Sequence, residues 1–214
     1  MQLAVKRLVD IVLSAVLLVA LLPVMIVIGV AVKATSPGEI IFRQQRGGRG
    51  GRPFMIYKFR TMAHDPLWSS RTTRVYEDDP RITRVGKLLR RMSLDELPQI
   101  VNVLLGDMSF VGPRPDLLHH VERYTPDQRH RLEVRPGITG WAQVAGRNDL
   151  SWDERIALDA EYLQDWSLRR DIAIVAKTAA VVLSGRGAAT PKGKGSPPPK
   201  RIEDAARDKD QPTI

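Results

Sequence analysis

The chain has 214 residues, of which 43% are hydrophobic and 27% charged, and it contains no cysteine. This length allows one globular domain of ordinary size with appendages and excludes two large domains. The absence of cysteine excludes disulfides and thiolate metal sites. The formal net charge of +9 indicates a polyanionic partner, which could be nucleic acid, an anionic membrane surface or a phosphorylated ligand.

The N-terminal segment predicts a membrane helix, because residues 11–32 carry no charged side chain and match the thickness of a bilayer core. Length alone favours a straight spanning helix. Pro23 favours a bend near the middle, since proline removes a backbone hydrogen bond and clashes one turn back. Basic residues flank both ends, with Lys6 and Arg7 before the segment and Lys33 after it, which favours two cytoplasmic ends. That pattern indicates a re-entrant helix, with a spanning helix as the alternative.

Two short strands are predicted next, over residues 39–43 and 53–57, joined by the glycine-rich residues 47–51 as a hairpin loop. This loop lacks the strand-to-helix context of a phosphate-binding P-loop. Residues 64–79 are polar and without clear periodicity, which predicts an excursion outside the core. Asp78 and Asp79 end this excursion before a proline, a position typical of a turn or cap rather than a metal pair.

From Arg81 to Arg91, apolar and basic residues alternate in a way that predicts an amphipathic helix at a membrane interface or facing phosphate. The alternative is a solvated helix face.

The adjacent carboxylates Asp95 and Glu96 follow this basic segment. An acidic pair within basic sequence can recruit a divalent cation and phosphate oxygens to one point. Helix capping is the structural alternative, because Ser93 and Glu96 have the spacing of a capping box before the apolar run that ends at Leu105. Either way we expect the carboxylates near a helix N-terminus, where the macrodipole favours an ionised Asp95.

Arg114 stands between two prolines, which restrict the backbone around a bidentate donor suited to phosphate. A surface turn with an incidental arginine is the alternative. His119 and His120 follow, but no further ligand stands at suitable helical spacing, so we do not predict zinc.

Residues 135–148 are dense in glycine, so their backbone can approach a ligand closely. Trp141, Gln143 and Arg147 within this segment offer stacking and hydrogen bonds, as in a nucleotide-recognition loop.

The remaining sequence predicts two helices and a tail. Ser151 and Glu154 form a capping box before a helix whose apolar face we assign to the core. Residues 171–184 are too short to span a bilayer and predict a core or interfacial helix. Residues 185–214 combine glycine, proline and charge, which predicts disorder.

The segment from Ser93 to Pro115, SLDELPQIVNVLLGDMSFVGPRP, closely resembles the signature of the bacterial sugar transferases, the monotopic phosphoglycosyl transferases. The block YKFRTM, the run PGITGWAQ and the triplet GRN add to the resemblance in the same order. It departs at Leu22, where many members have a serine before the proline of the membrane helix, and at Ala145, where an asparagine is common.

The resemblance implies a mostly helical α+β fold with three parts. Residues 1–34 would form a re-entrant membrane helix kinked near Pro23. Residues 35–184 would form a compact cytosolic catalytic domain with a small β-hairpin and amphipathic interfacial helices, and residues 185–214 the tail. The implied location is the cytoplasmic face of the bacterial inner membrane.

The resemblance also implies an enzyme that transfers a sugar 1-phosphate from a UDP-sugar to a polyprenyl phosphate such as undecaprenyl phosphate, releasing UMP. Asp95 would form a covalent aspartyl-phosphosugar intermediate, and Glu96 would hold Mg²⁺. The side chains expected to bind substrate are Lys58, Arg60, Arg91, Arg114, Gln143 and Arg147. The reaction would be the first membrane step of glycoconjugate or exopolysaccharide biosynthesis.

Two other classes of function stay open. A membrane-anchored nucleic-acid binder is disfavoured, because only 6% of the residues are aromatic and no stacking platform stands out. A non-catalytic membrane adaptor fits if the carboxylate pair merely caps a helix. The pattern specifies neither the sugar nor the oligomeric state.

Overall fold

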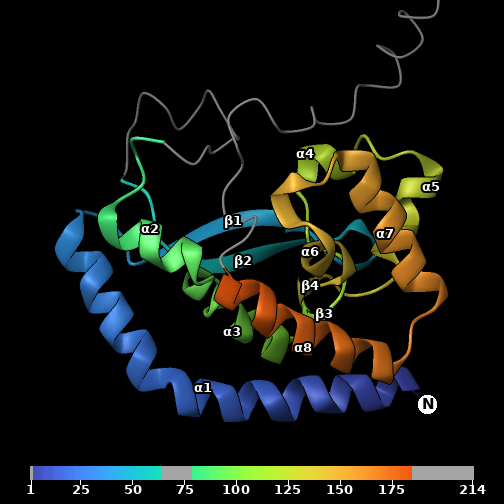
Figure 1. The fold of residues 1–214 in the computed structure, drawn as a ribbon, viewed down its shortest axis with the longest axis horizontal. Coiled ribbons are helices and arrows are strands. Elements are labelled where there is room, and N and C mark those ends of the chain that lie inside the picture. The colour runs from blue at the N-terminus through green and yellow to red at the C-terminus, as the bar shows by residue number, and fades with distance from the viewer. Residues whose placement is uncertain (1, 64–78, 185–214) are drawn as a thin grey trace, which may run out of the picture.

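The computed structural model describes residues 2–63 and 79–184. They form a mostly helical α+β fold in which a long apolar helix runs along one side of two small sheets (Figure 1). The predicted fold class is confirmed at this level. Most of the predicted excursion, including Asp78, and the whole predicted tail lie outside the described residues.

Helix α1 (Gln2–Thr35) contains Pro23 and changes direction partway along its length (Figure 1). Among the described residues it is the one helix long and apolar enough to cross a membrane. Asp10 and Ser14 are buried in its first half, and Ile28 and Val32 in its second half. Both halves of α1 therefore pack against the rest of the protein, whereas many apolar side chains between them are exposed.

Polar contacts dock the first half of α1. Arg7 donates to the carbonyls of Val103 and Leu104, in the last turn of α3 (Gln99–Leu105), at 2.7 and 2.9 Å. Carbonyls at a helix C-terminus lack helical partners, so these bonds cap α3. The buried carboxylate of Asp10 accepts a hydrogen bond from the hydroxyl of Ser109 at 3.1 Å. The N-terminus of the apolar helix is thus held on the globular part of the chain.

Strands β1 (Ile41–Gly47) and β2 (Pro53–Phe59) pair antiparallel. The predicted hairpin is confirmed, although both strands extend further toward their C-terminal ends than predicted. A 3₁₀ turn, Arg49–Gly51, lies in the loop. The amide of Asn102 bridges α3 to β2, since its Oδ1 accepts from the Tyr57 N–H at 3.1 Å and its Nδ2 donates to the Met55 carbonyl at 2.7 Å.

Helix α2 (Arg84–Arg91) begins three residues later than predicted. The hydroxyl of Thr83 accepts a hydrogen bond from the Gly86 N–H at 2.9 Å and so caps its first turn. Asp79 accepts from the backbone N–H of Arg81 at 3.0 Å, which confirms the predicted turn role for this aspartate.

A second sheet pairs β3 (Ser109–Val111) in parallel with β4 (Gly137–Thr139). Short helices connect and follow these strands: α4 (Leu118–Val121), α5 (Pro126–Arg129) and α6 (Trp141–Ala145). The glycine-dense segment predicted as a loop is therefore largely a strand and a helix.

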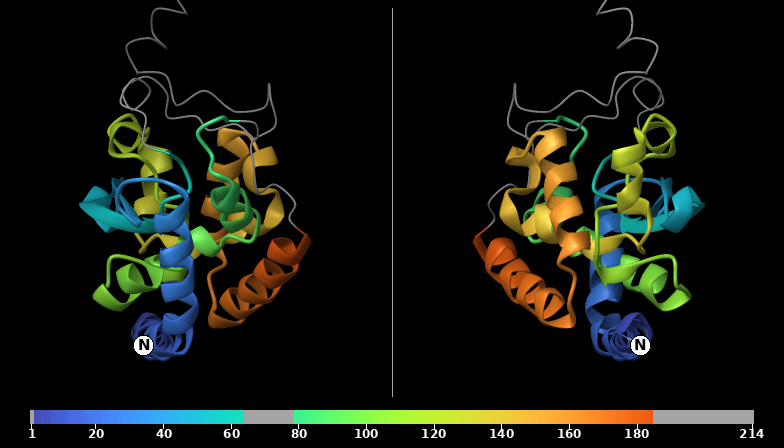
Figure 2. Two further views of the ribbon diagram at one scale, coloured as in Figure 1. Left: turned by 90° about the vertical axis from the view of Figure 1, so that its left-hand side faces the viewer. Right: turned by 90° about the vertical axis from the view of Figure 1, so that its right-hand side faces the viewer.

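The last two helices are α7 (Trp152–Gln164) and α8 (Leu168–Ser184). The predicted capping box of α7 is confirmed, because Ser151 Oγ accepts from the Glu154 N–H and Glu154 accepts from the Ser151 N–H. Asp171 of α8 is buried and pairs with Lys6 of α1. In keeping with this contact, α1 and α8 lie at the same end of the molecule (Figure 2).

One apolar cluster matters most for the site. It joins the second half of α1 to β2 and α2 through Ile28, Val32, Phe59 and Leu89. Leu94 and Leu97, which flank the predicted acidic pair, pack against this cluster. The turn that carries the carboxylates is therefore fixed directly to the apolar helix.

Candidate active site

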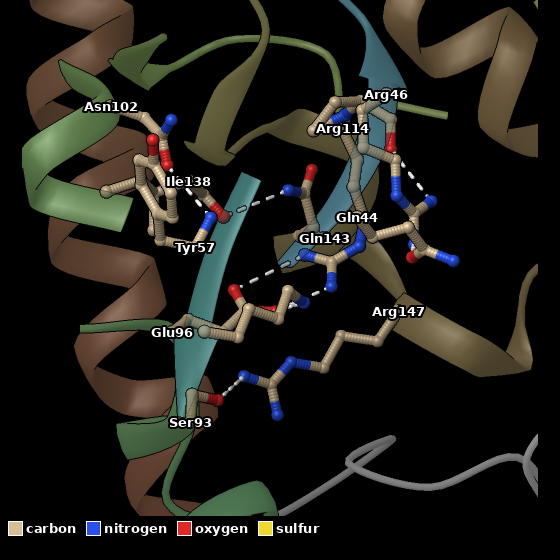
Figure 3. Close-up of polar contacts among 12 residues, drawn as sticks. Gln44, Arg46, Tyr57, Ser93, Glu96, Asn102, Arg114, Ile138, Gln143 and Arg147 are labelled. Atoms are coloured by element: carbon tan, nitrogen blue, oxygen red, sulfur yellow. Dashed lines mark hydrogen bonds and ion pairs between the residues drawn. The ribbon is translucent and has the colours of Figure 1, made fainter. Parts of the chain in front are cut away.

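Three separate segments meet at Glu96. The carboxylates lie in the 3₁₀ turn η2 (Leu94–Glu96), β2 supplies Lys58, and the turn after β3 supplies Arg114. Lys58 Nζ lies 2.8 Å from Glu96 Oε1. Arg114 Nη2 lies 2.6 Å from the same oxygen, and Figure 3 shows Arg114 and Glu96 turned toward each other. Arg114 Nη1 donates to Glu96 Oε2 at 3.4 Å. Both carboxylate oxygens of Glu96 are thus engaged by cations.

The charges in this cluster reinforce one another. Burial by itself raises the pKa of Glu96, but Arg114 and Lys58 outweigh burial and hold this pKa well below its ordinary value. Glu96 in turn raises the pKa of Arg114. The Glu96 side chain is only 15% exposed, whereas that of Arg114 is 47% exposed. Arg114 can therefore meet a ligand from solvent while it holds Glu96.

Asp95 differs sharply from its neighbour. Within residues 2–63 and 79–184, its carboxylate makes no hydrogen bond or ion pair. Burial, followed by the adjacent charge of Glu96, raises the pKa of Asp95 to about 6. This carboxylate is ionised at neutral pH, as expected, although burial raises its pKa. In the described part of the chain, Asp95 is thus a carboxylate without a hydrogen bond or ion pair, next to Glu96, which is paired with two cations.

The predicted capping box at Ser93 is wrong. Ser93 adopts the left-handed conformation with φ 55°, and its side chain caps nothing. Pro98 occupies the position before α3. Glu96 is drawn to Lys58 and Arg114, so it cannot reach back to the Ser93 backbone. The prediction that both carboxylates lie near the start of a helix is confirmed, because η2 leads directly into α3.

Arg90, not the predicted Arg91, approaches the acidic pair. The side chain of Arg91 is exposed at the end of α2, whereas burial lowers the pKa of Arg90 against the opposing effect of Asp95. Gly86 and Leu89 are buried on the inner face of α2, and Arg90 follows Gly86 by four residues on that face. The helical spacing of α2 therefore indicates Arg90 rather than Arg91, and this signal was present in the sequence.

The structure places the side chain of Arg60 at the turn that follows α1. Its guanidinium donates to the carbonyls of Ser36 and Pro37 at 2.6 and 2.8 Å, and so secures the turn that leaves α1. Arg60 lies one residue beyond β2, and its N–H donates to the Ile40 carbonyl at 2.9 Å. The guanidinium of Arg60 therefore lies at the turn after α1, whereas the ammonium of Lys58 lies at Glu96.

Gln143 and Arg147 approach the cluster from the segment after β4. Gln143 Nε2 donates to the Ile138 carbonyl at 3.3 Å, and its Oε1 is buried without a partner among the described residues. Arg147 Nη2 donates to Ser93 Oγ at 3.0 Å (Figure 3). Burial lowers the pKa of Arg147, although Glu96 opposes this effect.

Trp141 does not offer a stacking surface to this site. Its ring lies 5.0 Å from the guanidinium carbon of Arg170 and 4.5 Å from the ammonium of Lys177. Its indole N–H donates to Glu161 at 3.0 Å. The ring of Trp141 is therefore covered by two cations of α8, and its N–H is taken by Glu161 of α7.

Arg46 and Arg131 support the turn that carries Arg114. Neither residue was predicted from the sequence. Buried Arg131 donates to the Arg114 carbonyl at 3.0 Å and to the Tyr124 hydroxyl at 2.9 Å. Arg46 Nη1 donates to the carbonyl of Pro115, the residue after Arg114, at 3.4 Å, while burial and the like charge of Arg114 lower the pKa of Arg46 to about 10. These contacts join residues far apart in sequence, so spacing gave no signal for them.

Comparison with known proteins identifies relatives. A family model described as bacterial sugar transferase matches residues 1–185. The uncharacterized sugar transferase EpsL of Bacillus subtilis is 43% identical over 183 residues, which cover 85% of this chain and 89% of that protein. The exopolysaccharide production protein ExoY of Sinorhizobium fredii is 41% identical over 196 residues, covering 85% and 87%. The undecaprenyl-phosphate galactose phosphotransferase of Salmonella typhimurium is 44% identical over 197 residues, covering 86% of this chain but 41% of that protein.

The raised pKa of Asp95 predicts that Asp95→Asn stabilises the protein at neutral pH. Because the folded-state pKa of about 6 exceeds the ordinary 3.8, the charged carboxylate lowers stability progressively between these values and fully above them. We expect Asp95→Asn in metal-free detergent to raise the free energy of unfolding by about 1–2 kcal/mol at pH 7.5, with the gain vanishing near pH 4. Thermal unfolding across pH measures it, with exposed Asp149→Asn as control. A destabilised Asp95→Asn at pH 7.5 contradicts the assignment.

Proposed function

This chain belongs to the bacterial sugar transferase family, and we propose that it transfers a sugar 1-phosphate from a UDP-sugar to undecaprenyl phosphate at the start of polysaccharide synthesis. The names of relatives support the acceptor: one is an undecaprenyl-phosphate galactose phosphotransferase, and others are UDP-glucose:undecaprenyl-phosphate glucose-1-phosphate transferases. The products are UMP and a polyprenyl diphosphate sugar.

The contrast between Asp95 and Glu96 carries the proposal. A nucleophile needs a free electron pair, and Asp95 has an unengaged carboxylate while Glu96 is held on both oxygens. An oxygen of Asp95 attacks the β-phosphorus of the UDP-sugar, and the bond from that phosphorus to UMP breaks. A phosphate oxygen of undecaprenyl phosphate then attacks the same phosphorus and releases Asp95.

The cations around the pair suit a diphosphate substrate. Arg114 and Lys58 hold Glu96, and the same donors match phosphate oxygens in charge and geometry. We infer that the diphosphate takes over these donors on binding, with Arg90 and Arg147 at the edge of the site. Arg91 and Arg60 have no place in this set.

The carboxylates fit Mg²⁺ in number and chemistry, since this ion is commonly held by one or two carboxylates together with substrate phosphates. Glu96 would hold it once Arg114 and Lys58 turn to the diphosphate. When bound, the ion neutralises charge on the phosphates. Substrate phosphates and water would complete its ligand set.

The packing of α1 supports a re-entrant membrane helix. A straight helix of this length extends about 50 Å and would place its ends on opposite sides of a bilayer. Instead Asp10 contacts β3, and Val32 packs with Phe59 of β2. Because both halves of α1 contact one globular unit, we infer that α1 enters and leaves the membrane on its cytoplasmic face.

The contacts of the acidic pair do not support the alternative function, a non-catalytic membrane adaptor. It required the acidic pair to cap a helix, and neither carboxylate accepts a capping hydrogen bond among the contacts that the structure describes.

UMP release tests the activity. Wild-type membranes given undecaprenyl phosphate and a panel of UDP-sugars should release UMP with at least one sugar. Asp95→Asn should lower that rate by about 10³-fold or more, as loss of a nucleophile does, whereas Asp149→Asn should leave it unchanged. Turnover by Asp95→Asn at the wild-type rate would exclude the covalent route.

The absence of cysteine makes the topology directly measurable. Single cysteines at Gln2 and at Thr35, the two ends of α1, should react with a membrane-impermeant maleimide from the same side, the cytoplasmic one. A third cysteine at exposed Val19 should stay protected by lipid. Labelling of the two ends from opposite sides would establish a spanning helix instead.

The paired state of Glu96 predicts how metal-free enzyme binds UDP. Glu96→Gln should tighten UDP binding in EDTA about tenfold, because Arg114 and Lys58 then face the phosphates without competition. Asp95→Asn removes the same charge but frees neither cation, so its gain should stay below about threefold. Calorimetry measures both affinities. Equal gains would mean that only net charge matters.

A further inference from the structure

Two left-handed residues meet beside the acidic pair. Ser93, with φ 55°, and Arg147, with φ 52°, are the non-glycine residues with positive φ in the part of the chain that the structure describes. They lie 54 residues apart in sequence, yet Arg147 Nη2 donates to Ser93 Oγ at 3.0 Å. Residues other than glycine, asparagine and aspartate rarely adopt this conformation, and it costs on the order of 1 kcal/mol. Such costs collect at functional sites.

The backbone of Ser93 sets the direction of the nucleophile turn. Its N–H donates to the Arg90 carbonyl at 3.2 Å at the end of α2, and its carbonyl accepts from the Glu96 N–H at 3.2 Å in η2. The left-handed residue therefore joins the two segments at a sharp bend. Beyond this bend Leu94 packs toward α1 while Glu96 meets Lys58 and Arg114.

The side chain of Ser93 reaches a different segment. Arg147 follows Gly146, where a Cβ atom would approach Leu150 to 2.8 Å, so the chain is tightly packed at this point. From there the Arg147 side chain extends across to Ser93, on the same side of the site as Glu96 (Figure 3). One hydrogen bond thus links the nucleophile turn to the segment after β4.

We propose that Ser93 is a positioning residue with two separable roles: its backbone directs the Asp95 turn, and its hydroxyl holds the Arg147 guanidinium at the edge of the acidic pair. This inference rests on the proposed function, because the diphosphate of a UDP-sugar is the ligand that Arg147 would meet there. The ordinary alternative is that the hydroxyl is incidental and only the bend matters.

Two substitutions separate these roles. Ser93→Gly removes the hydroxyl and adopts the left-handed conformation without strain, whereas Ser93→Ala removes the hydroxyl and keeps the strain. Both should raise KM for the UDP-sugar about five- to tenfold, with kcat changed less than about twofold, because a hydrogen bond to a charged group is lost before the substrate binds. Thermal unfolding should separate them, with Ser93→Gly at least as stable as wild type and Ser93→Ala less stable.

Two further variants complete the test. Ser93→Asn tolerates the left-handed conformation and offers an acceptor, so it should restore KM to within about threefold of wild type. Combining Ser93→Gly with Arg147→Met should raise KM no more than Arg147→Met alone, since the two residues act through one contact. A wild-type KM for Ser93→Gly, or losses that multiply in the double variant, would overturn the positioning role. Wild-type enzyme that releases no UMP would instead refute the proposed function.

Discussion

The ion pairs of Glu96 with Lys58 and Arg114 are the constraint on which the site depends. They bring a strand, a 3₁₀ turn and the turn after β3 to one point, and removal of one partner would leave an unpaired charge in a largely buried setting. The same contacts also make the two adjacent carboxylates chemically different. Because Lys58 and Arg114 pair with Glu96, the adjacent Asp95 keeps a carboxylate without an ion pair among the described residues. Its pKa is raised to about 6.

This site is fixed directly to the apolar helix α1. Leu94 and Leu97 flank the carboxylates and pack with the second half of α1, while Arg7 caps α3, the helix that follows the carboxylates. The arrangement suits an acceptor whose polyprenyl chain stays in lipid while its phosphate must reach Asp95. Under the proposed function, a rigid connection between α1 and Asp95 would limit the freedom lost when that phosphate binds.

Local signals predicted the fold well, and long-range contacts decided the rest. The apolar helix, the hairpin and the capping box of α7 each depend on residues close in sequence, and all three are confirmed. The capping box at Ser93 had the same spacing as the one at Ser151 but is wrong, because Glu96 finds stronger partners 38 and 18 residues away. Likewise, Arg60 is engaged by the turn after α1, which spacing could not reveal.

The most direct measurement of the central claim is to trap and locate the intermediate. Enzyme mixed briefly with UDP-sugar, without undecaprenyl phosphate, is quenched in acid and reduced with borohydride, which converts an aspartyl phosphate to homoserine. A covalent intermediate on Asp95 predicts homoserine at position 95, an unchanged Glu96, and no conversion in Asp95→Asn. Reduction at Glu96, or UMP release with no modified carboxylate in either residue, would contradict it.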